Sequence, residues 1–316
     1  MEKIILDCDP GMDDSVAMLL ALSTPSIELM AVTTVNGNYP VAVTTKNALK
    51  IMSLMGRGDI PVARGMERPI LRCAPPDPFS HGADGQAETN LPEPIFLAHP
   101  SHAVEVIREM VMAHPHEITL VATGPLSNIA MALIMYPQIK PLIKAVVAIS
   151  GAFGFNDASF SNATGDTPQS EWNVYVDPEA AKLVYESGLN LRLIGLDVAT
   201  NFRVDFTEEQ IRTMASSQAK GAKFLSTAIS FVKGRGFGAY CAVIDAIAVA
   251  SVADKDLVSF KEYHVGVDTR DGLTLGMTVR DGRHHFVWEH LPLVNVAVDA
   301  KYVRFLQILE EGMLRG

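Results

Sequence analysis

The chain has 316 residues, of which 48% are hydrophobic, and its net charge is −10. The length allows one large α/β domain or two smaller ones, and the hydrophobic content is sufficient for a sizeable core. The negative charge argues against nucleic acid as a partner, because such binding requires patches of Lys and Arg that neutralise phosphates. No signal peptide precedes the first expected strand, and no apolar run reaches the roughly 20 residues of a membrane helix, so we expect a cytoplasmic protein with no membrane contact.

The first predicted elements are a buried strand at the apolar residues 4–6, a tight turn at Pro10 and Gly11, and a helix beginning with the apolar residues 16–20. Four carboxylates, at positions 7, 9, 13 and 14, fall between this strand and this helix. Close like charges resist ionisation unless a cation or the start of a helix offsets them. Helix capping would account for two or three of these acids but not for all four, so we favour a metal site. Oxygen ligands without a His or Cys partner indicate calcium or magnesium rather than zinc.

Strands and helices alternate along most of the chain, which favours βαβ units and a parallel sheet. The expected strands are 27–34, 60–63, 118–122, 145–149, 191–196, 262–267, 274–279 and 293–298, and the expected helices are 41–55, 102–113, one that Asp177 and Pro178 open, and 300–314. No linker or repeat divides the chain. We therefore predict one domain over residues 1–316: an α/β fold with a mostly parallel central sheet flanked by helices, a Rossmann-like core, and an active site at the C-terminal edge of the strands.

Long polar stretches interrupt this pattern at 73–100, 151–172 and 233–240, and loops of this length are usually functional or disordered. The first contains His81, for which a role in a site and a solvated surface position are about equally plausible from the sequence. Thr123 follows an expected strand at the start of a Gly-Pro turn, where an ordinary turn with a Ser helix cap is the simpler interpretation. Asp245 stands alone among apolar residues, which indicates either a cationic partner or an exposed helix end.

The three cysteines, Cys8, Cys73 and Cys241, have no spacing typical of a disulfide framework or a zinc site, and we expect free thiols.

Residues 7–14 (DCDPGMDD) resemble the signature of the nucleoside hydrolases, enzymes that cleave the N-glycosidic bond of ribonucleosides with a bound calcium ion. The resemblance continues over nearly the whole chain. Further segments that are similar to the family are 33–38 (TTVNGN), 123–130 (TGPLSNIA), 171–173 (EWN), 177–181 (DPEAA) and 195–197 (GLD).

The resemblance implies hydrolysis of ribonucleosides to ribose and free base, in salvage of purines or pyrimidines, by homodimers or homotetramers. It assigns calcium to Asp9, Asp14, the Thr123 carbonyl and Asp245, and makes Asp9 the general base for a calcium-bound water. It places Asp7 behind these ligands. The residues implied to bind the ribose are Asp13, Asn38, Asn162, Glu171 and Asn173. A site built to bond those hydroxyls would reject deoxyribose.

One position departs from the family. Many members have a His directly before the last calcium Asp, where it acts on the leaving base, whereas this chain has Ile244. An aliphatic side chain cannot donate a proton. His81 is the first candidate for that role, and Tyr240 and Arg235 come next, with Cys241 behind them. Stacking of the base on Trp172 is an alternative.

Two other functions remain open from the sequence. A calcium-dependent nucleoside-binding or sensing protein would retain the ribose site but have weak or altered turnover because of Ile244. A phosphatase of the haloacid dehalogenase type also has an Asp-x-Asp after its first strand, but it would leave Pro10, Gly11 and the 171–173 segment unexplained. The order of these hypotheses is hydrolase, sensor, phosphatase.

Overall fold

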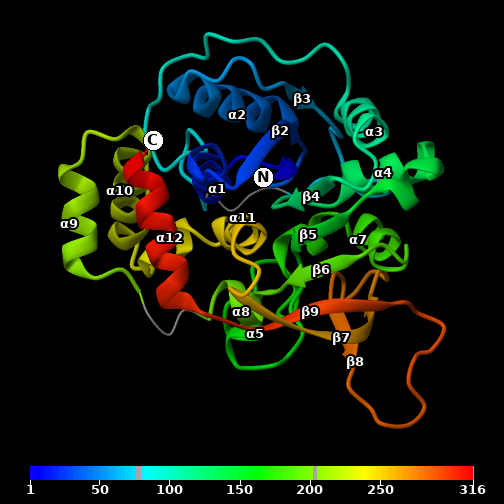
Figure 1. Cartoon of the computed structure of the whole chain (residues 1–316). Helices are drawn as coiled ribbons and strands as arrows, with labels where there is room; N and C mark the ends of the chain where they lie inside the picture. Colours follow the sequence, from blue (N-terminus) through cyan, green and yellow to red (C-terminus); the bar gives the residue numbers. More distant parts are fainter. Residues whose placement is uncertain (76–79, 202–204, 316) are drawn as a thin grey trace.

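A computed structural model describes residues 1–75, 80–201 and 205–315, and its centre is a sheet with the strand order β3-β2-β1-β4-β5-β6-β9-β7-β8 (Figure 1). The strands are β1 (Glu2–Cys8), β2 (Ile27–Thr34), β3 (Val62–Arg64), β4 (Ile118–Ala122), β5 (Ala145–Ile149), β6 (Leu191–Ile194), β7 (Val258–Val267), β8 (Thr278–Asp281) and β9 (Leu293–Ala300). Pairing is parallel from β3 through to β9, and β7 is antiparallel to both β9 and β8. The structure thus confirms the predicted fold class, a single α/β domain with a mostly parallel sheet.

Helices cover both faces of this sheet (Figure 1). They are α1 (Met12–Ser23), α2 (Val41–Met55), α3 (Ala103–Ala113), α4 (Ser127–Met135), α5 (Ala158–Ser161), α6 (Trp172–Val176), α7 (Pro178–Tyr185), α8 (Leu196–Ala199), α9 (Glu208–Ser216), α10 (Lys220–Gly234), α11 (Ala246–Ala253) and α12 (Tyr302–Arg315), with 3₁₀ turns η1 (Pro137–Leu142) and η2 (Ala239–Ala242). In the part of the chain that the structure describes, no helix is both long and apolar enough to cross a membrane.

Two hydrophobic cores result, one on each face of the sheet. Helices α1, α2, α10, α11 and α12 enclose one core, and α3, α4 and α7 enclose the other. Alternation along β1 divides its side chains between them: Leu6 and Cys8 enter the first core and Ile5 the second. Cys8 therefore lies beneath the acidic turn rather than in it, as the strand period predicts. All three cysteines are free.

Several boundaries differ from those predicted. Strand β6 ends at Ile194, not at Leu196, because α8 begins there, and β8 covers 278–281 rather than 274–279. Helices α9 and α10 lie in a stretch that carries no prediction above. Helix α6 precedes the helix opened by Asp177 and was not predicted as a separate element. The predicted loop at 73–100 includes residues 76–79, which lie outside the described residues.

Candidate functional site

A cavity of about 180 Å³ opens at the C-terminal ends of the parallel strands. Its walls come from the turns after β4, β5 and β6, from the loop that contains His81, and from the start of α11. The lining residues are Asp13, Asn38, Ser80, His81, Thr123, Ile149, Thr164, Glu171, Trp172, Asn173, Leu196, Ile244 and Asp245. Eight of the predicted site residues are among them, although they are far apart in the sequence.

Asp14 holds the acidic turn together. One of its carboxylate oxygens accepts the backbone N–H of Gly11 at 3.0 Å, and the other accepts the N–H of Asp9 at 3.3 Å and the hydroxyl of Thr123 at 2.7 Å. The first of these bonds also satisfies a donor at the start of α1, where free N–H groups favour a negative charge. Asp14 thereby ties the end of β1 to the turn after β4.

The carboxylates of Asp13, Asp14 and Asp245 converge, with one oxygen from each within 4.8 Å of the other two. All three side chains are buried. Burial raises the pKa of Asp13 to about 6, and burial with the charge of Asp13 raises the pKa of Asp14 to about 6. Burial, followed by the charges of Asp13 and Asp14, raises the pKa of Asp245 well above its ordinary value. A cation at this point would remove the repulsion, so these residues fit a metal ion with hard oxygen ligands.

Asp9 lies beside this group and is oriented by a loop. Its Oδ2 accepts the N–H of Asn38 at 2.6 Å, and its Oδ1 is buried with no hydrogen-bond partner among the described residues. Two glycines make room for it: a Cβ on Gly37 would lie 2.0 Å from Oδ2, and a Cβ on Gly124 would lie 2.6 Å from Oδ1. Burial, together with the charge of Asp14, raises the pKa of Asp9 well above its ordinary value.

This arrangement differs from the predicted ligand set in one respect. Among the described residues, the group with metal-ligand spacing contains Asp13 in place of Asp9. Asp9 is also absent from the residues that line the cavity. The predicted fourth ligand, the Thr123 carbonyl, is at the cavity and accepts a hydrogen bond from the side-chain amide of Asn173 at 2.8 Å.

Asn173 and Glu171 form another part of the cavity wall. The Nδ2 of Asn173 donates to the carbonyls of Thr123 and Ile149, at 2.8 and 3.1 Å, so its Oδ1 remains the group that can accept from a ligand. Glu171 caps α6 and accepts three backbone N–H groups, from Asn173 at 2.8 Å and from Val174 and Gly151 at 3.1 Å. Burial nevertheless raises the pKa of Glu171 to about 7.

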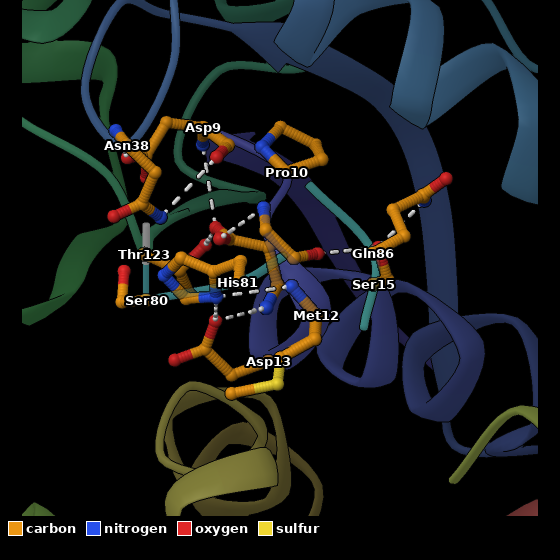
Figure 2. A network of polar contacts seen from close by, with 12 residues as sticks. Asp9, Pro10, Met12, Asp13, Ser15, Asn38, Ser80, His81, Gln86 and Thr123 are labelled. Atoms are coloured by element: carbon orange, nitrogen blue, oxygen red, sulfur yellow. Dashed lines mark hydrogen bonds and ion pairs between the residues drawn. The ribbon is translucent and has the colours of Figure 1, made fainter. Parts of the chain in front are cut away.

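His81 lies over the Pro10–Gly11 turn, 7% exposed. Its Nδ1 accepts the N–H of Met12 at 3.3 Å and is 3.5 Å from Asp13 Oδ1 (Figure 2). A Cβ on Gly11 would lie 2.6 Å from that nitrogen, so the ring can lie on the turn only because residue 11 is glycine. When the ring is neutral and Nδ1 accepts a hydrogen bond, its proton is on Nε2. Ile244 also lines the cavity and leaves this side without a second histidine.

Three predicted substrate-binding residues are not among those lining the cavity. Asn162 donates to the hydroxyl of Thr200 at 3.0 Å. Arg235 lies at the end of α10 and donates to the carbonyl of Ser80 at 3.2 Å, so it contacts the His81 loop and not the cavity. Tyr240 lies in η2, next to Cys241, whose pKa burial raises to about 11. Such a thiol is a weak acid, which makes Cys241 a poor proton donor to the leaving base.

The sequence also missed part of the site. Ser80, Thr164, Ile149 and Leu196 line the cavity, but apart from the proximity of Ser80 to His81 nothing in their local pattern distinguishes them. Trp172 lines it as well, stacked on Tyr175 with ring centres 6.1 Å apart, and its indole N–H has no hydrogen-bond partner within the described ranges.

Asp7 does not line the cavity and lies behind the acidic turn, where the resemblance had placed it. Its Oδ1 accepts from the Thr33 hydroxyl at 2.6 Å and from the Asn128 amide at 2.7 Å. These bonds link β1 to β2 and to the start of α4.

The known proteins to which this chain is similar are all nucleoside hydrolases in the comparisons below. The sequence model of the family "Inosine-uridine preferring nucleoside hydrolase" matches residues 4–307. A pyrimidine-specific ribonucleoside hydrolase RihA from Salmonella arizonae is 34% identical over 313 residues, covering 98% of this chain and 97% of the relative. The RihA of Shewanella baltica is 37% identical over 281 residues, covering 88% and 86%.

Among solved structures, the plant nucleoside hydrolase PpNRh1 has a TM-score of 0.87 at 28% identity and covers 99% of both chains. The purine-preferring ribonucleoside hydrolase from Gardnerella vaginalis has a TM-score of 0.85 at 29% identity and covers 99% of this chain and 98% of its own.

Proposed function

The chain belongs to the inosine-uridine preferring nucleoside hydrolase family and hydrolyses ribonucleosides to ribose and base, and from this premise we propose that it is a calcium-dependent enzyme that prefers pyrimidine ribonucleosides. The observation that carries the proposal is the buried carboxylate group of Asp13, Asp14 and Asp245 at the cavity. Family membership excludes the phosphatase alternative. The relatives named pyrimidine-specific support the choice of base.

Asp9, Asp14, Asp245 and the Thr123 carbonyl would hold the calcium ion, with Asp13 beside it. An all-oxygen donor set suits this hard cation. Bound calcium would offset the clustered negative charge and lower the pKa of a water in the site.

Asp9 takes the proton from the attacking water. It fits this role because its Oδ1 has no partner in the described part of the chain, while its Oδ2 is held by the Asn38 N–H at 2.6 Å. One oxygen is thus fixed and the other remains to accept a proton.

The ribose is held by hydrogen-bond acceptors. Asp13 and Asn173 would accept from its 2′ and 3′ hydroxyls, and Glu171 from its 5′ hydroxyl. Cleavage at C1′ develops positive charge on the sugar, which the surrounding carboxylates stabilise, while the grip on three hydroxyls fixes C1′ relative to the water.

His81 assists departure of the base. Its ring is 3.5 Å from Asp13, the residue assigned to the 2′ hydroxyl, so it lies on the C2′ side of the sugar. In an anti pyrimidine nucleoside the O2 atom is on that same side of the glycosidic bond, whereas N7 of a purine is on the other. A proton from His81 Nε2 to O2 would therefore favour pyrimidine departure, and the aliphatic Ile244 offers no second donor.

The test is release of free base from uridine, cytidine, inosine, adenosine and guanosine, with calcium and with a calcium chelator. We expect uridine and cytidine to be cleaved faster than the purine nucleosides, chelation to abolish release, and 2′-deoxyuridine to be cleaved at least about a thousandfold more slowly than uridine. Turnover that survives complete chelation would refute the calcium assignment. Calorimetric binding of a nucleoside without release of its base would favour the sensor alternative.

The role of Asp9 has a separate test. Replacing Asp9 by Asn should lower kcat by about 10³-fold while the dissociation constant for ribose changes little, because the base is lost and the acceptors for the sugar remain. Activity close to that of the wild type would remove Asp9 as the base. Asp59→Asn serves as a control, because that carboxylate is on the surface and pairs with Arg57.

We also propose a cytoplasmic enzyme of nucleoside salvage that assembles as a homodimer or homotetramer. The free state of all three cysteines supports a reducing compartment. Light scattering coupled to size exclusion would test the assembly, and a monomer at micromolar concentration would refute it.

A further inference from the structure

The loop that carries His81 closes on itself through backbone and side-chain bonds. The N–H of Ala87 donates to the carbonyl of His81 at 2.8 Å. Asp84 accepts the N–H groups of Gln86, Glu88 and Asn90 at 2.7, 2.9 and 3.1 Å. The position of His81 therefore depends on how residues 84–90 are held.

This loop is strained directly after Gln86. Ala87, Glu88 and Asn90 have φ angles of +58°, +57° and +50°, in the left-handed region that residues with a Cβ rarely adopt. Such conformations persist only where surrounding contacts impose them, and they cluster at functional sites. The loop needs an anchor outside itself.

Tyr39 and Asn47 hold the loop by donating to the carbonyls of Gly82 and Asp84, and Gln86 supplies the anchor next to the strained residues. Its side chain is fully buried, and its Nε2 donates to the Ser15 hydroxyl at 3.0 Å and to the Asn47 carbonyl at 3.3 Å. Figure 2 shows Gln86 beside Ser15, which in turn donates to the carbonyl of Gly11 at 2.6 Å. The N–H of the next residue, Met12, is the one that donates to His81 Nδ1.

We infer that Gln86 is a positioning residue for His81, and this inference rests on the proposed role of His81 as proton donor to the leaving base. The imidazole and Gln86 hold opposite ends of the peptide group between Gly11 and Met12: the ring accepts its N–H, and Gln86 reaches its carbonyl through the Ser15 hydroxyl. Without the amide, the strained loop can relax, the ring moves relative to the turn, and the Nε2 proton is no longer aimed at the base. A small misplacement of a proton donor is costly to the rate.

The experiment compares two substrates of the full-length, calcium-loaded enzyme. Uridine needs a proton on its leaving base, whereas 4-nitrophenyl β-D-ribofuranoside releases a stable nitrophenolate without one. For Gln86→Leu we expect kcat on uridine to fall about tenfold with little change in KM, and the rate on the nitrophenyl riboside to change by less than about twofold. A merely structural role would lower both rates together, which would overturn the inference.

Two further variants sharpen the comparison. Ser15→Ala removes only the hydroxyl between Gln86 and Gly11, so it should give the same selective loss even if Gln86→Leu folds poorly. Thr45→Val is the matched control. Like the hydroxyl of Ser15, that of Thr45, on α2, is buried and hydrogen-bonded, in this case to Thr34 and Val41, but it makes no hydrogen bond to the His81 loop. It should leave both rates unchanged.

A double variant separates this inference from the proposed function. His81→Ala should itself lower the uridine rate selectively, and adding Gln86→Leu to it should have no further effect, because both changes act through one ring. Additive losses would overturn the positioning role. If His81→Ala cleaves uridine as fast as the wild type does, the proton-donor proposal fails and this inference fails with it. If the wild type cleaves neither substrate, the proposed function itself is refuted.

Discussion

At the scale of single residues, the position of the Asp9 carboxylate depends on neighbouring residues that have no side chain. A Cβ at Gly37 would lie 2.0 Å from Asp9 Oδ2, in a place where the carboxylate cannot yield because it is bonded to Asn38. Gly37→Ala should therefore displace Asp9 and reduce kcat by at least about a hundredfold.

Gly234→Ala is the matched control for that change. Gly234 is the last residue of α10 and a Cβ there meets nothing within 4 Å, so the variant should keep full activity and gain up to about 1 kcal/mol of stability. Steady-state kinetics and thermal unfolding of both variants check the pair. Equal activity of Gly37→Ala and wild type would show that activity does not depend on the close contact between residue 37 and Asp9.

The acids of the first turn show how far the sequence could go at this scale. Their number and spacing indicated a cation site, and the resemblance separated their roles, but neither could tell that Asp13 rather than Asp9 would converge with Asp14 and Asp245. That outcome depends on the direction of each side chain, which Asn38 and two glycines determine through tertiary contacts. The contact of Arg235 with the Ser80 carbonyl is of the same kind, because nothing in the sequence around Arg235 indicated that partner.

At the scale of elements, Asp177 connects three segments. It caps α7 through the Ala180 N–H at 3.0 Å, and its other oxygen accepts from the Ser127 hydroxyl at 2.6 Å and the Ile70 N–H at 2.9 Å. Asp177→Ala would leave these donors without partners in a buried place, so we expect a loss of about 2–4 kcal/mol in the free energy of unfolding.

Asp157→Ala is the control for this prediction. Asp157 also precedes a helix, α5, but it is exposed and its side chain makes no capping bond, so the variant should be within about 0.5 kcal/mol of wild type. Chemical denaturation measures both. Similar losses for the two variants would mean that α7 does not depend on its cap.

Elements with a strong local signal were predictable from the sequence, and those defined by tertiary contacts were not. The Asp-Pro start of α7 and the apolar runs of β4 and β5 were placed correctly. Strand β8 was shifted, because four residues at the edge of the sheet gain their strand character only from pairing with β7. Helix α9 is polar over most of its length and buries only Met214, so few apolar residues marked it in the sequence. The predicted Ser cap at position 127 was also wrong, since that hydroxyl bonds to Asp177 instead.

At the scale of the whole molecule, the fold concentrates buried carboxylates at one edge of the sheet, and the cost of ionising them should depend on pH. The pKa values of Asp13 and Asp14 are raised to about 6, and those of Glu171 and Asp7 to about 7, in each case chiefly by burial. Between about pH 4.5 and 7 the folded chain therefore binds more protons than the unfolded chain, and its stability must fall as pH rises.

Two aspartate–arginine ion pairs away from the cavity do not oppose this trend. The carboxylates of Asp268 and Asp281 have lowered pKa values because of their hydrogen bonds to Arg270 and Arg283, so their stabilising effect is lost only as the pH falls below about 4. Above that pH they remain ionised in both states. The site at the sheet edge thus dominates the slope between pH 4.5 and 7.

We accordingly expect the midpoint of thermal unfolding, measured in a calcium chelator, to decrease from pH 5 to pH 7.5. With excess calcium the midpoint should stay level or rise, because an ion that binds only the folded carboxylates stabilises more as they lose their protons. Glu171→Gln should flatten the slope in chelator, since a buried carboxyl with a pKa of about 7 costs roughly 3 kcal/mol when ionised, and it should keep the calcium effect because the metal group is intact. Parallel curves with and without calcium would mean that the ion does not bind these carboxylates.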